Sequence, residues 1–258
     1  MRYEATGRHS AITSAHIAQL GACAAGDANP LPIFDDLATN VVRNLTKTSV
    51  IHKFPAGEII VHEREPLRGL NIILSGIVDL AQVYGDHECG VLLLSAKDLL
   101  MPSATLFREP ALVTARALTI TKIMEIDAAV LQTELKHSAV LASNLMKAIS
   151  GQWRMAVRNI LDLNCRSAPQ RLGAFLLRIA DLQAESGTAA LPISKRHLAI
   201  RLGMTSETLS RMLQVVATNG LYLRGRTIIV HDRLSIEKFC GPPPYMDIDE
   251  RSLDVFAL

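Results

Sequence analysis

One stretch, ISKRHLAIRLGMTSETLSR at Ile193–Arg211, constrains the fold of this chain more than any other. Its small, flexible and apolar residues have the spacing of two short helices joined by a tight turn. Ala199 is small enough to let a second helix approach closely, and Gly203 can adopt the positive φ that a sharp turn requires. Leu209, six residues further on, places an apolar side chain between the helices. This spacing predicts a helix-turn-helix.

The second of these helices has the features of one that contacts DNA. It begins at Thr205 and Ser206, residue types that favour helix N-termini. Its first side chains therefore point outward, as they do in helices that enter the major groove of B-DNA. Six Lys and Arg residues and a single acid lie between Ser194 and Arg226, although the net charge of the whole chain is only +2. A surface that binds phosphates is typically basic in this way. An ordinary solvated helical hairpin would explain the charges but not the spacing.

A hairpin follows the predicted second helix. Two short β-type runs, Leu221–Leu223 and Thr227–Val230, flank a turn of sequence Arg-Gly-Arg. Such a wing carries Arg224 and Arg226 toward the sugar-phosphate backbone. Together with the helix-turn-helix it predicts a winged-helix domain at residues 165–240.

The N-terminal half of the chain has a β texture. Short runs of β-branched or alternating residues are separated by turn sequences rich in glycine. The runs are Glu58–Val61, Leu70–Leu74, Ile77–Val83, Gly90–Leu94 and Thr119–Ile126. They predict an antiparallel β-roll at residues 30–127, with a short amphipathic helix at 35–48, and the fold class is α+β. We expect residues 1–29 to form a flexible arm and 241–258 a flexible or surface-packed tail.

Residues 128–164 follow the period of a helix with two apolar faces. One face advances in alternating steps of four and three, through Leu135, Ala139, Ala142, Met146, Ile149, Trp153, Ala156, Ile160 and Leu163. The other face, with Leu131, Leu141 and Leu145, is expected to pack against the β domain. Two apolar faces need two partners, and the second is most simply the same helix of another subunit. Burial of both faces within one chain is the alternative. The predicted dimer interface comprises Leu135, Ala142, Met146, Ile149, Trp153, Ala156 and Ile160.

Composition narrows the class of protein further. At 258 residues, with 49% hydrophobic and 20% charged residues, the chain is long enough for two ordinary globular domains. It has no run long enough to cross a membrane, and its N-terminus lacks the apolar core of a signal peptide. The four cysteines are scattered without a CxxC pair, which favours a reducing compartment and hence the cytoplasm. No GxSxG, HExxH, P-loop or GxGxxG context organises a catalytic site, so we do not expect an enzyme.

An N-terminal β-roll, a long dimerisation helix and a C-terminal winged helix together resemble the Crp/Fnr superfamily of transcription regulators. The resemblance covers about residues 30–240. Besides the helix-turn-helix, it is sharpest at FPAGEII (54–60), ILSGIVDL (73–80) and RSAPQRLGAFLL (166–177). It implies a cyclic-nucleotide-binding-like roll and a homodimer that binds double-stranded DNA, with RNA polymerase as a further partner.

The recognition helix resembles the Fnr-like branch, which carries Glu-x-x-Ser-Arg, here Glu207, Ser210 and Arg211. The resemblance implies a palindrome with TTGA-type half-sites. Arg211 would donate two bonds to guanine, Glu207 would accept from cytosine N4, and Ser210 would contact a neighbouring base or a thymine methyl. Ser206, a fourth expected base contact, stands where the cyclic-AMP-sensing member has Arg. Phosphate contacts are expected from Lys195, Arg196, Thr205, Arg224 and Arg226.

The family sets its activity by an effector or a redox state sensed through the β-roll, and here that site is atypical. Residues 97–116 have neither the Gly-Glu nor the Arg-Ser pair of cyclic-AMP-binding members, which argues against cyclic AMP. Arg116 is present, but a lone arginine on a strand is more often a surface or ion-pairing residue. Cys23 has no neighbouring cysteines, which argues against a [4Fe–4S] cluster. The carbon-monoxide-sensing relative has a haem-ligand histidine near the position of Met101–Ser103, and none stands here. The alternatives are DNA binding without an effector, or a haem gas sensor.

Histidines and cysteines supply the remaining candidates. His52, His62 and His87 lie in the predicted roll and would serve as haem or metal ligands in some other geometry, although three unrelated surface histidines are the favoured interpretation. We predict no metal site. The redox candidates are Cys89, Cys165 and Cys23. The acidic neighbours of Cys89 argue against a reactive thiolate, and a buried structural thiol is the favoured interpretation of Cys165, at the expected hinge.

Overall fold

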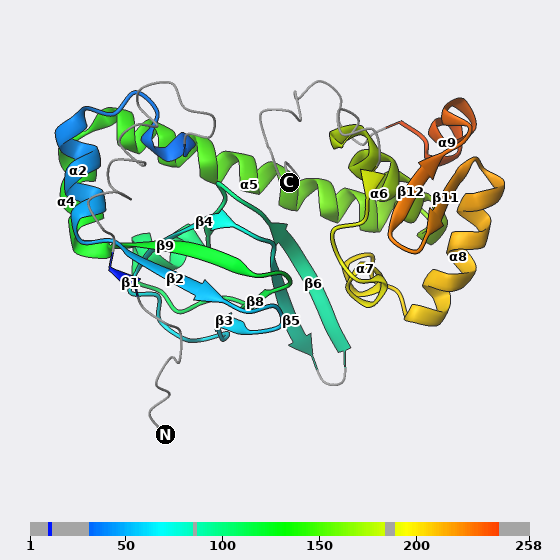
Figure 1. The fold of residues 1–258 in the computed structure, drawn as a ribbon, viewed down its shortest axis with the longest axis horizontal. Coiled ribbons are helices and arrows are strands. Elements are labelled where there is room, and N and C mark those ends of the chain that lie inside the picture. The colour runs from blue at the N-terminus through cyan, green and yellow to red at the C-terminus, as the bar shows by residue number, and fades with distance from the viewer. Residues whose placement is uncertain (1–9, 12–30, 85–86, 184–188, 243–258) are drawn as a thin grey trace. The chain divides into compact units, whose positions relative to one another are not determined.

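The computed structural model describes residues 10–11, 31–84, 87–183 and 189–242 (Figure 1). The chain divides into two compact units. The first comprises Met1–Leu80 and Leu93–Trp153, and the second comprises Ala81–Leu92 and Arg154–Leu258. The expected boundaries at 127 and 164 differ from this division, because the second unit also includes residues 81–92 and the end of the long helix. The expected tail, apart from Gly241 and Pro242, lies outside the described residues.

The predicted antiparallel β-roll is confirmed (Figure 1). Along its five-stranded sheet the order is β1 (Ser10–Ala11), β2 (Val50–Phe54), β9 (Thr121–Asp127), β4 (Gly69–Ser75) and β7 (Leu99–Leu100). Along its four-stranded sheet the order is β3 (Ile59–Val61), β8 (Thr114–Ala117), β5 (Val78–Tyr84) and β6 (His87–Leu94). The patterns above did not single out β1, β2, β7 or β8. Strand β1 lies inside the expected arm, whose other residues are outside the described part of the chain.

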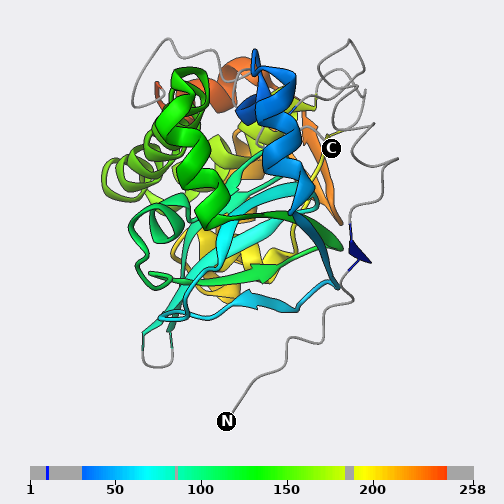
Figure 2. The same cartoon turned by 90° about the vertical axis from the view of Figure 1, so that its left-hand side faces the viewer.

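Helices accompany the roll. They are η2, a 3-10 helix (Pro32–Phe34), α2 (Thr39–Lys47), α3 (Pro102–Phe107), α4 (Ala128–His137) and α5 (Ala139–Cys165). Helix α2 confirms the amphipathic helix expected within 35–48, with Val41, Val42 and Leu45 buried. Figures 1 and 2 show α2 beside α4, where Asn44 Nδ2 donates a hydrogen bond to Glu134 Oε1 at 2.8 Å.

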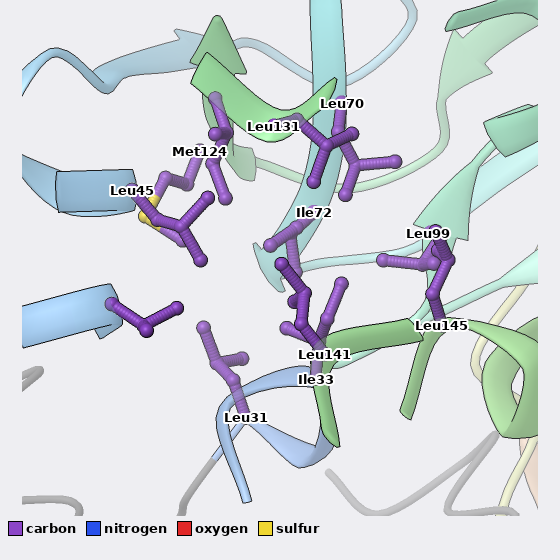
Figure 3. Close-up of a cluster of buried hydrophobic side chains, with 12 residues drawn as sticks. Leu31, Ile33, Leu45, Leu70, Ile72, Leu99, Met124, Leu131, Leu141 and Leu145 are labelled. Carbon is purple, nitrogen blue, oxygen red and sulfur yellow. The ribbon is translucent and has the colours of Figure 1, made fainter. Parts of the chain in front are cut away.

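The core of the first unit lies where helices α4 and α5 meet the five-stranded sheet (Figure 3). Its buried residues are Leu31, Ile33, Val41, Leu45, Leu70, Ile72, Leu99, Met124, Ile126, Leu131, Leu141 and Leu145. The predicted inner face of Leu131, Leu141 and Leu145 is thus confirmed. Beside this face, the buried Asn144 donates hydrogen bonds from Nδ2 to the main-chain carbonyls of Ile33 and Asp35. Helix α5 thereby fixes the segment of chain that precedes α2.

The helix expected at 128–164 is two helices, separated at Ser138. This residue has extended backbone angles, φ −122° and ψ 99°, and its Oγ accepts a hydrogen bond from Leu141 N at 3.2 Å. A serine in this position satisfies one of the free N–H groups at the start of α5. The basic residues Lys136 and His137 lie in the last turn of α4, and a positive charge there interacts favourably with the helix dipole. The interruption therefore has a local cause that hydrophobic periodicity does not report.

The second unit contains the predicted winged helix. Its elements are α6 (Ala168–Leu182), β10 (Ala189–Ala190), α7 (Lys195–Arg201), α8 (Ser206–Thr218), β11 (Leu221–Arg224), β12 (Thr227–Val230) and α9 (Arg233–Cys240). Ser167 and Gln170 form a capping box at the start of α6, which fixes where the domain begins. No described helix is long and apolar enough to cross a membrane.

A half-buried carboxyl in the roll makes stability depend on pH. Asp98 accepts a hydrogen bond from Ser95 N at 2.8 Å, and burial raises its pKa from the usual 3.8 to about 6, although the bonds from Ser95 oppose this. Between these two values the folded state binds more protons than the unfolded state, so the free energy of unfolding falls as pH rises. In the wild-type protein we expect the free energy of unfolding to fall by up to about 2 kcal/mol across this window, a value already reduced for the remaining solvent contact of Asp98. Asp98→Asn should abolish this fall, because asparagine does not titrate. Urea unfolding from pH 4 to 7 measures this, and parallel curves for the two proteins would contradict it.

Candidate nucleic-acid interface

The helix-turn-helix has the packing that its sequence predicts. Helices α7 and α8 are joined at Gly203, which has φ +65°. Ala199 is only 1% exposed and Leu209 only 2%, so both lie in the interior of the domain. Met204 N donates to Ala199 O at 3.0 Å and closes the turn. The three residues that define the motif therefore have the roles expected of them.

The start of α8 presents polar side chains to solvent. Thr205 is the N-cap, and its Oγ1 accepts a hydrogen bond from Thr208 N at 3.1 Å, which confirms the expected helix start. The four expected base contacts, Ser206, Glu207, Ser210 and Arg211, are all exposed. Their positions in the helix, i, i+1, i+4 and i+5, place them on one face. The Ser210 hydroxyl donates to Ser206 O at 3.1 Å, so its remaining hydrogen-bonding capacity is that of an acceptor.

The wing is confirmed as a hairpin. Strands β11 and β12 pair from Leu221↔Val230 to Arg224↔Thr227, and Gly225 in the turn has φ +61°. Arg224 is exposed. Arg226 is also exposed, but its Nε donates to Leu191 O at 2.9 Å, so one edge of its guanidinium is already bound to the protein. The short strand β10, which extends this sheet beside β12, was not predicted.

The start of α7 adds two more cations to the same domain. Ser194 caps this helix by accepting a hydrogen bond from His197 N at 3.2 Å. Lys195 and Arg196, expected to contact phosphates, follow the cap and are exposed. The basic side chains therefore come from three elements: the first helix, the recognition helix α8 and the wing.

The outer face of α5 leaves large apolar side chains uncovered. Met146 is 63% exposed, Trp153 68% and Ile160 54%, at intervals of seven residues. Ala142 and Ala156 of the predicted interface are half-buried. Leu135 and Ile149 are half-buried because they pack against the core of the first unit. The part of the predicted stripe that faces solvent is therefore its centre and C-terminal end.

The cysteine expectations are partly wrong. Cys165 is exposed at the end of α5, not buried as expected. Cys89 is also exposed, whereas Cys23 lies outside the described residues. Cys240 is buried, and desolvation raises the pKa of its thiol to about 11, which keeps it protonated at neutral pH.

Of the three candidate histidines, His52 and His62 have separate partners in the described chain. His52 Nε2 lies 3.1 Å from Glu125 Oε2, and the main-chain N–H of His62 donates to Glu65 Oε2 at 2.8 Å. The side chain of His87 is outside the described part. Among the described residues no three His, Cys, Asp or Glu side chains are grouped so as to hold a metal ion.

Sequence reasoning missed a set of hinge residues. Arg166, Gln170 and Arg171 belong to the family motif quoted above, but their roles were not predicted. Each donates side-chain hydrogen bonds to main-chain carbonyls at the ends of helices. The available signal was two arginines and a glutamine directly after a long helix, where free carbonyls need donors.

Comparison with known proteins gives the same architecture. A family model described as a Crp-like helix-turn-helix domain matches residues 170–239, and one described as a cyclic nucleotide-binding domain matches residues 51–138. The CRP-like cAMP-activated global transcriptional regulator of Mycobacterium tuberculosis is 24% identical over 78% of this chain and 92% of its own. Electron transport regulator A of Shewanella oneidensis is 25% identical, over 83% and 84% of the two chains. The structure of FixK2 from Bradyrhizobium japonicum has 24% identity and a TM-score of 0.65, over 73% and 96% of the two chains.

The two matched domains, in this order and with these relatives, define a class of DNA-binding transcription regulators. The chain belongs to the Crp/Fnr superfamily.

The turn glycine can be tested directly. We expect Gly203→Val to lower the free energy of unfolding by about 1–2 kcal/mol or more, because a β-branched residue is strained at positive φ. A Cβ at this position would lie 3.4 Å from Leu163 Cδ2, an ordinary contact, so the cost comes from the backbone. Gly203→Asn is the matched control, because asparagine tolerates the left-handed region. Thermal unfolding measures both, and equal losses of stability would contradict the backbone explanation.

Proposed function

We propose that this protein acts as a homodimer that binds a TTGA-type palindrome and regulates transcription together with RNA polymerase. The observation that carries the proposal is the exposed polar face at the start of α8, where Glu207, Ser210 and Arg211 repeat the Fnr-like pattern. Two-fold symmetric proteins bind two-fold symmetric sites, with one recognition helix in each of two successive major grooves.

Each side chain of this face has a chemical role in the proposal. Arg211 donates two hydrogen bonds to guanine O6 and N7, and Glu207 accepts one from cytosine N4. Ser210 accepts from a neighbouring base or touches a thymine methyl. The phosphate contacts come from Lys195, Arg196, Thr205, Arg224 and the free edge of Arg226. These contacts position the domain on DNA, whereas the face of α8 selects the sequence.

The dimer in this proposal forms through the outer face of α5. The exposed apolar side chains of Met146, Trp153 and Ile160 form a line along this helix. A contiguous apolar stripe costs free energy in water and is covered when two copies pack side by side. The seven-residue interval is that of two helices that pack as a coiled coil.

Cyclic AMP is not part of this proposal, although the Mycobacterium tuberculosis relative is named as activated by it. Residues 97–116 lack both residue pairs expected to hold a cyclic phosphate, and Arg116 in this segment lies on strand β8. It alternates along β8 with Ala115 and Ala117, which are fully buried, and its NH1 lies 3.4 Å from the carbonyl oxygen of Gly57. Because side chains alternate along a strand, Arg116 lies on the face of β8 opposite these two buried alanines, which offers no support for a phosphate contact inside the roll.

Base recognition is tested at Arg211. We expect Arg211→Ala to weaken binding to a TTGA palindrome by about 1–3 kcal/mol and to relax selectivity for the guanine, because the bidentate contact is lost. Fluorescence anisotropy with labelled duplexes, one with TTGA half-sites and one scrambled, measures both effects.

The matched control is Arg224→Ala in the wing. This variant should weaken binding to both duplexes equally and reduce the slope of log K against log salt by about 1, as for a phosphate contact. Equal losses of Arg211→Ala on the two duplexes, or no loss at all, would rule out the proposed base contact.

Dimerisation is tested at Trp153, the only tryptophan of the chain. Burial of a large apolar side chain contributes about 1.5–3 kcal/mol, and a two-fold interface contains it twice. We therefore expect Trp153→Glu to weaken self-association by about 3–6 kcal/mol, more than 100-fold in Kd. Analytical ultracentrifugation measures the change in Kd. The control is Lys147→Glu, at an exposed residue of α5 outside the apolar stripe. Unaltered self-association of Trp153→Glu would place the dimer contact elsewhere.

A further inference from the structure

The end of α5 is tied to the helix-turn-helix by one arginine of α6. Arg171 NH1 donates to Leu163 O at 3.3 Å and to Arg166 O at 2.8 Å, both at the C-terminal end of α5. Its NH2 donates to Leu202 O at 3.2 Å, at the C-terminal end of α7. All these residues belong to the second unit. One guanidinium thus bonds to both the long helix and the turn that precedes the recognition helix.

A second contact joins the same two elements. The Leu163 Cδ2 atom lies 3.4 Å from the point where a Cβ on Gly203 would stand, so the side chain packs against the turn. Leu163 is also the last residue of the apolar stripe predicted on α5. Two separate contacts, one polar and one apolar, fix the direction of a rigid element better than either alone. They lie where the predicted dimer stripe ends.

The geometry requires an arginine in particular. A planar guanidinium offers donors in several directions, whereas a lysine ammonium is a single point charge on a flexible stem. The Arg171 side chain is half-buried, and its Nε finds no hydrogen-bond partner in the described residues. Leaving a buried donor unpaired costs free energy. Three bonds to main-chain carbonyls hold the side chain in place despite this cost.

We propose that Arg171 is a positioning residue that determines which half-site spacing the dimer accepts. The inference rests on the proposed function, a dimer on a palindrome. The stripe on α5 sets where the two long helices lie, and Arg171 sets the direction of α8 from the end of each α5. The two recognition helices then match half-sites one helical turn of DNA apart, and an altered spacing is rejected. Without Arg171 each domain adjusts its direction more freely, and the rejection weakens.

The experiment uses the full chain and a set of TTGA duplexes. These carry a single half-site, or a palindrome with spacers shortened or lengthened by one and two base pairs around the best one. For Arg171→Gln we expect affinity for the single half-site within about twofold of wild type, and a preference for the best spacer at least tenfold smaller. Arg171→Lys, which keeps the charge and the stem, should lie between the two. A preference for the best spacer that is unchanged in Arg171→Gln overturns the inference.

Arg166→Gln is the matched control. Arg166 NH1 bonds to Asp162 Oδ1 at 2.7 Å and its NH2 to Pro242 O at 3.0 Å, with no bond to α7 or α8 among the described residues. It should lower the melting temperature and leave the preference for spacing intact. If Arg166→Gln relaxes the preference as much as Arg171→Gln, the effect is general destabilisation and the inference is wrong.

Failure of the proposed function is distinguishable from failure of this inference. If the wild-type protein binds no TTGA duplex better than a scrambled one, the proposed function is wrong. Hydrogen exchange then still tests Arg171 on the free protein. The Gly203 and Met204 amides, which donate within the turn, should exchange faster in Arg171→Gln than in Arg166→Gln. Equal exchange in the two variants overturns the positioning role.

Discussion

The second unit is organised by the need to satisfy the carbonyl groups at helix ends. Helices α5, α7 and α9 all end close to residues 166–171, and each end leaves carbonyls without a partner in its own helix. Arg166 donates to the main-chain carbonyls of Gly241 and Pro242, which follow α9. Gln170 donates to the carbonyl of Phe239, in the last turn of α9. Arg171 donates to main-chain carbonyls at the ends of α5 and α7. Donors from one short segment thus hold three helix ends together, and positive charge there complements the helix dipoles.

The sequence predicted those parts of the molecule whose causes are local. A small residue, a turn glycine and an apolar contact within eleven residues are enough to define a helix-turn-helix, and Ala199, Gly203 and Leu209 have the expected roles. Thr205 as N-cap and Gly225 in the hairpin turn were predictable for the same reason. The roll was predictable as a class, because many short strands separated by glycine turns have few alternatives. The base contacts rest on resemblance as well as on exposure, and they stay predictions.

What the sequence did not predict depends on neighbours distant in the chain. Leu135 and Ile149 fit a heptad stripe, yet they pack partly against the core of their own unit. Periodicity gives the face of a helix but not what covers it. Cys165 was expected to be buried, because cysteine usually behaves as a small apolar residue. It is exposed, because it lies at the solvent-facing end of α5. Strand β8 has the sequence Thr-Ala-Arg-Ala, with no run of β-branched residues. Its pairing with β3 could therefore not be predicted from the local sequence.

The bonds of Arg171 contribute little free energy compared with the stability of the whole domain. Of the three bonds that Arg171 donates, the one to Leu202 O reaches the helix-turn-helix, where it adds to the packing of α6 against α8. A hydrogen bond from a charged donor contributes about 1.5–3 kcal/mol, which corresponds to a factor of roughly 10 to 150 in an equilibrium constant. A domain of this size is stable by about 5–15 kcal/mol, so losing this bond leaves the fold intact. Moving such an equilibrium from one side to the other takes about 5.5 kcal/mol. The bond to Leu202 O alone contributes less than this amount, and Leu163, at the end of the same apolar stripe, adds a second contact with the turn.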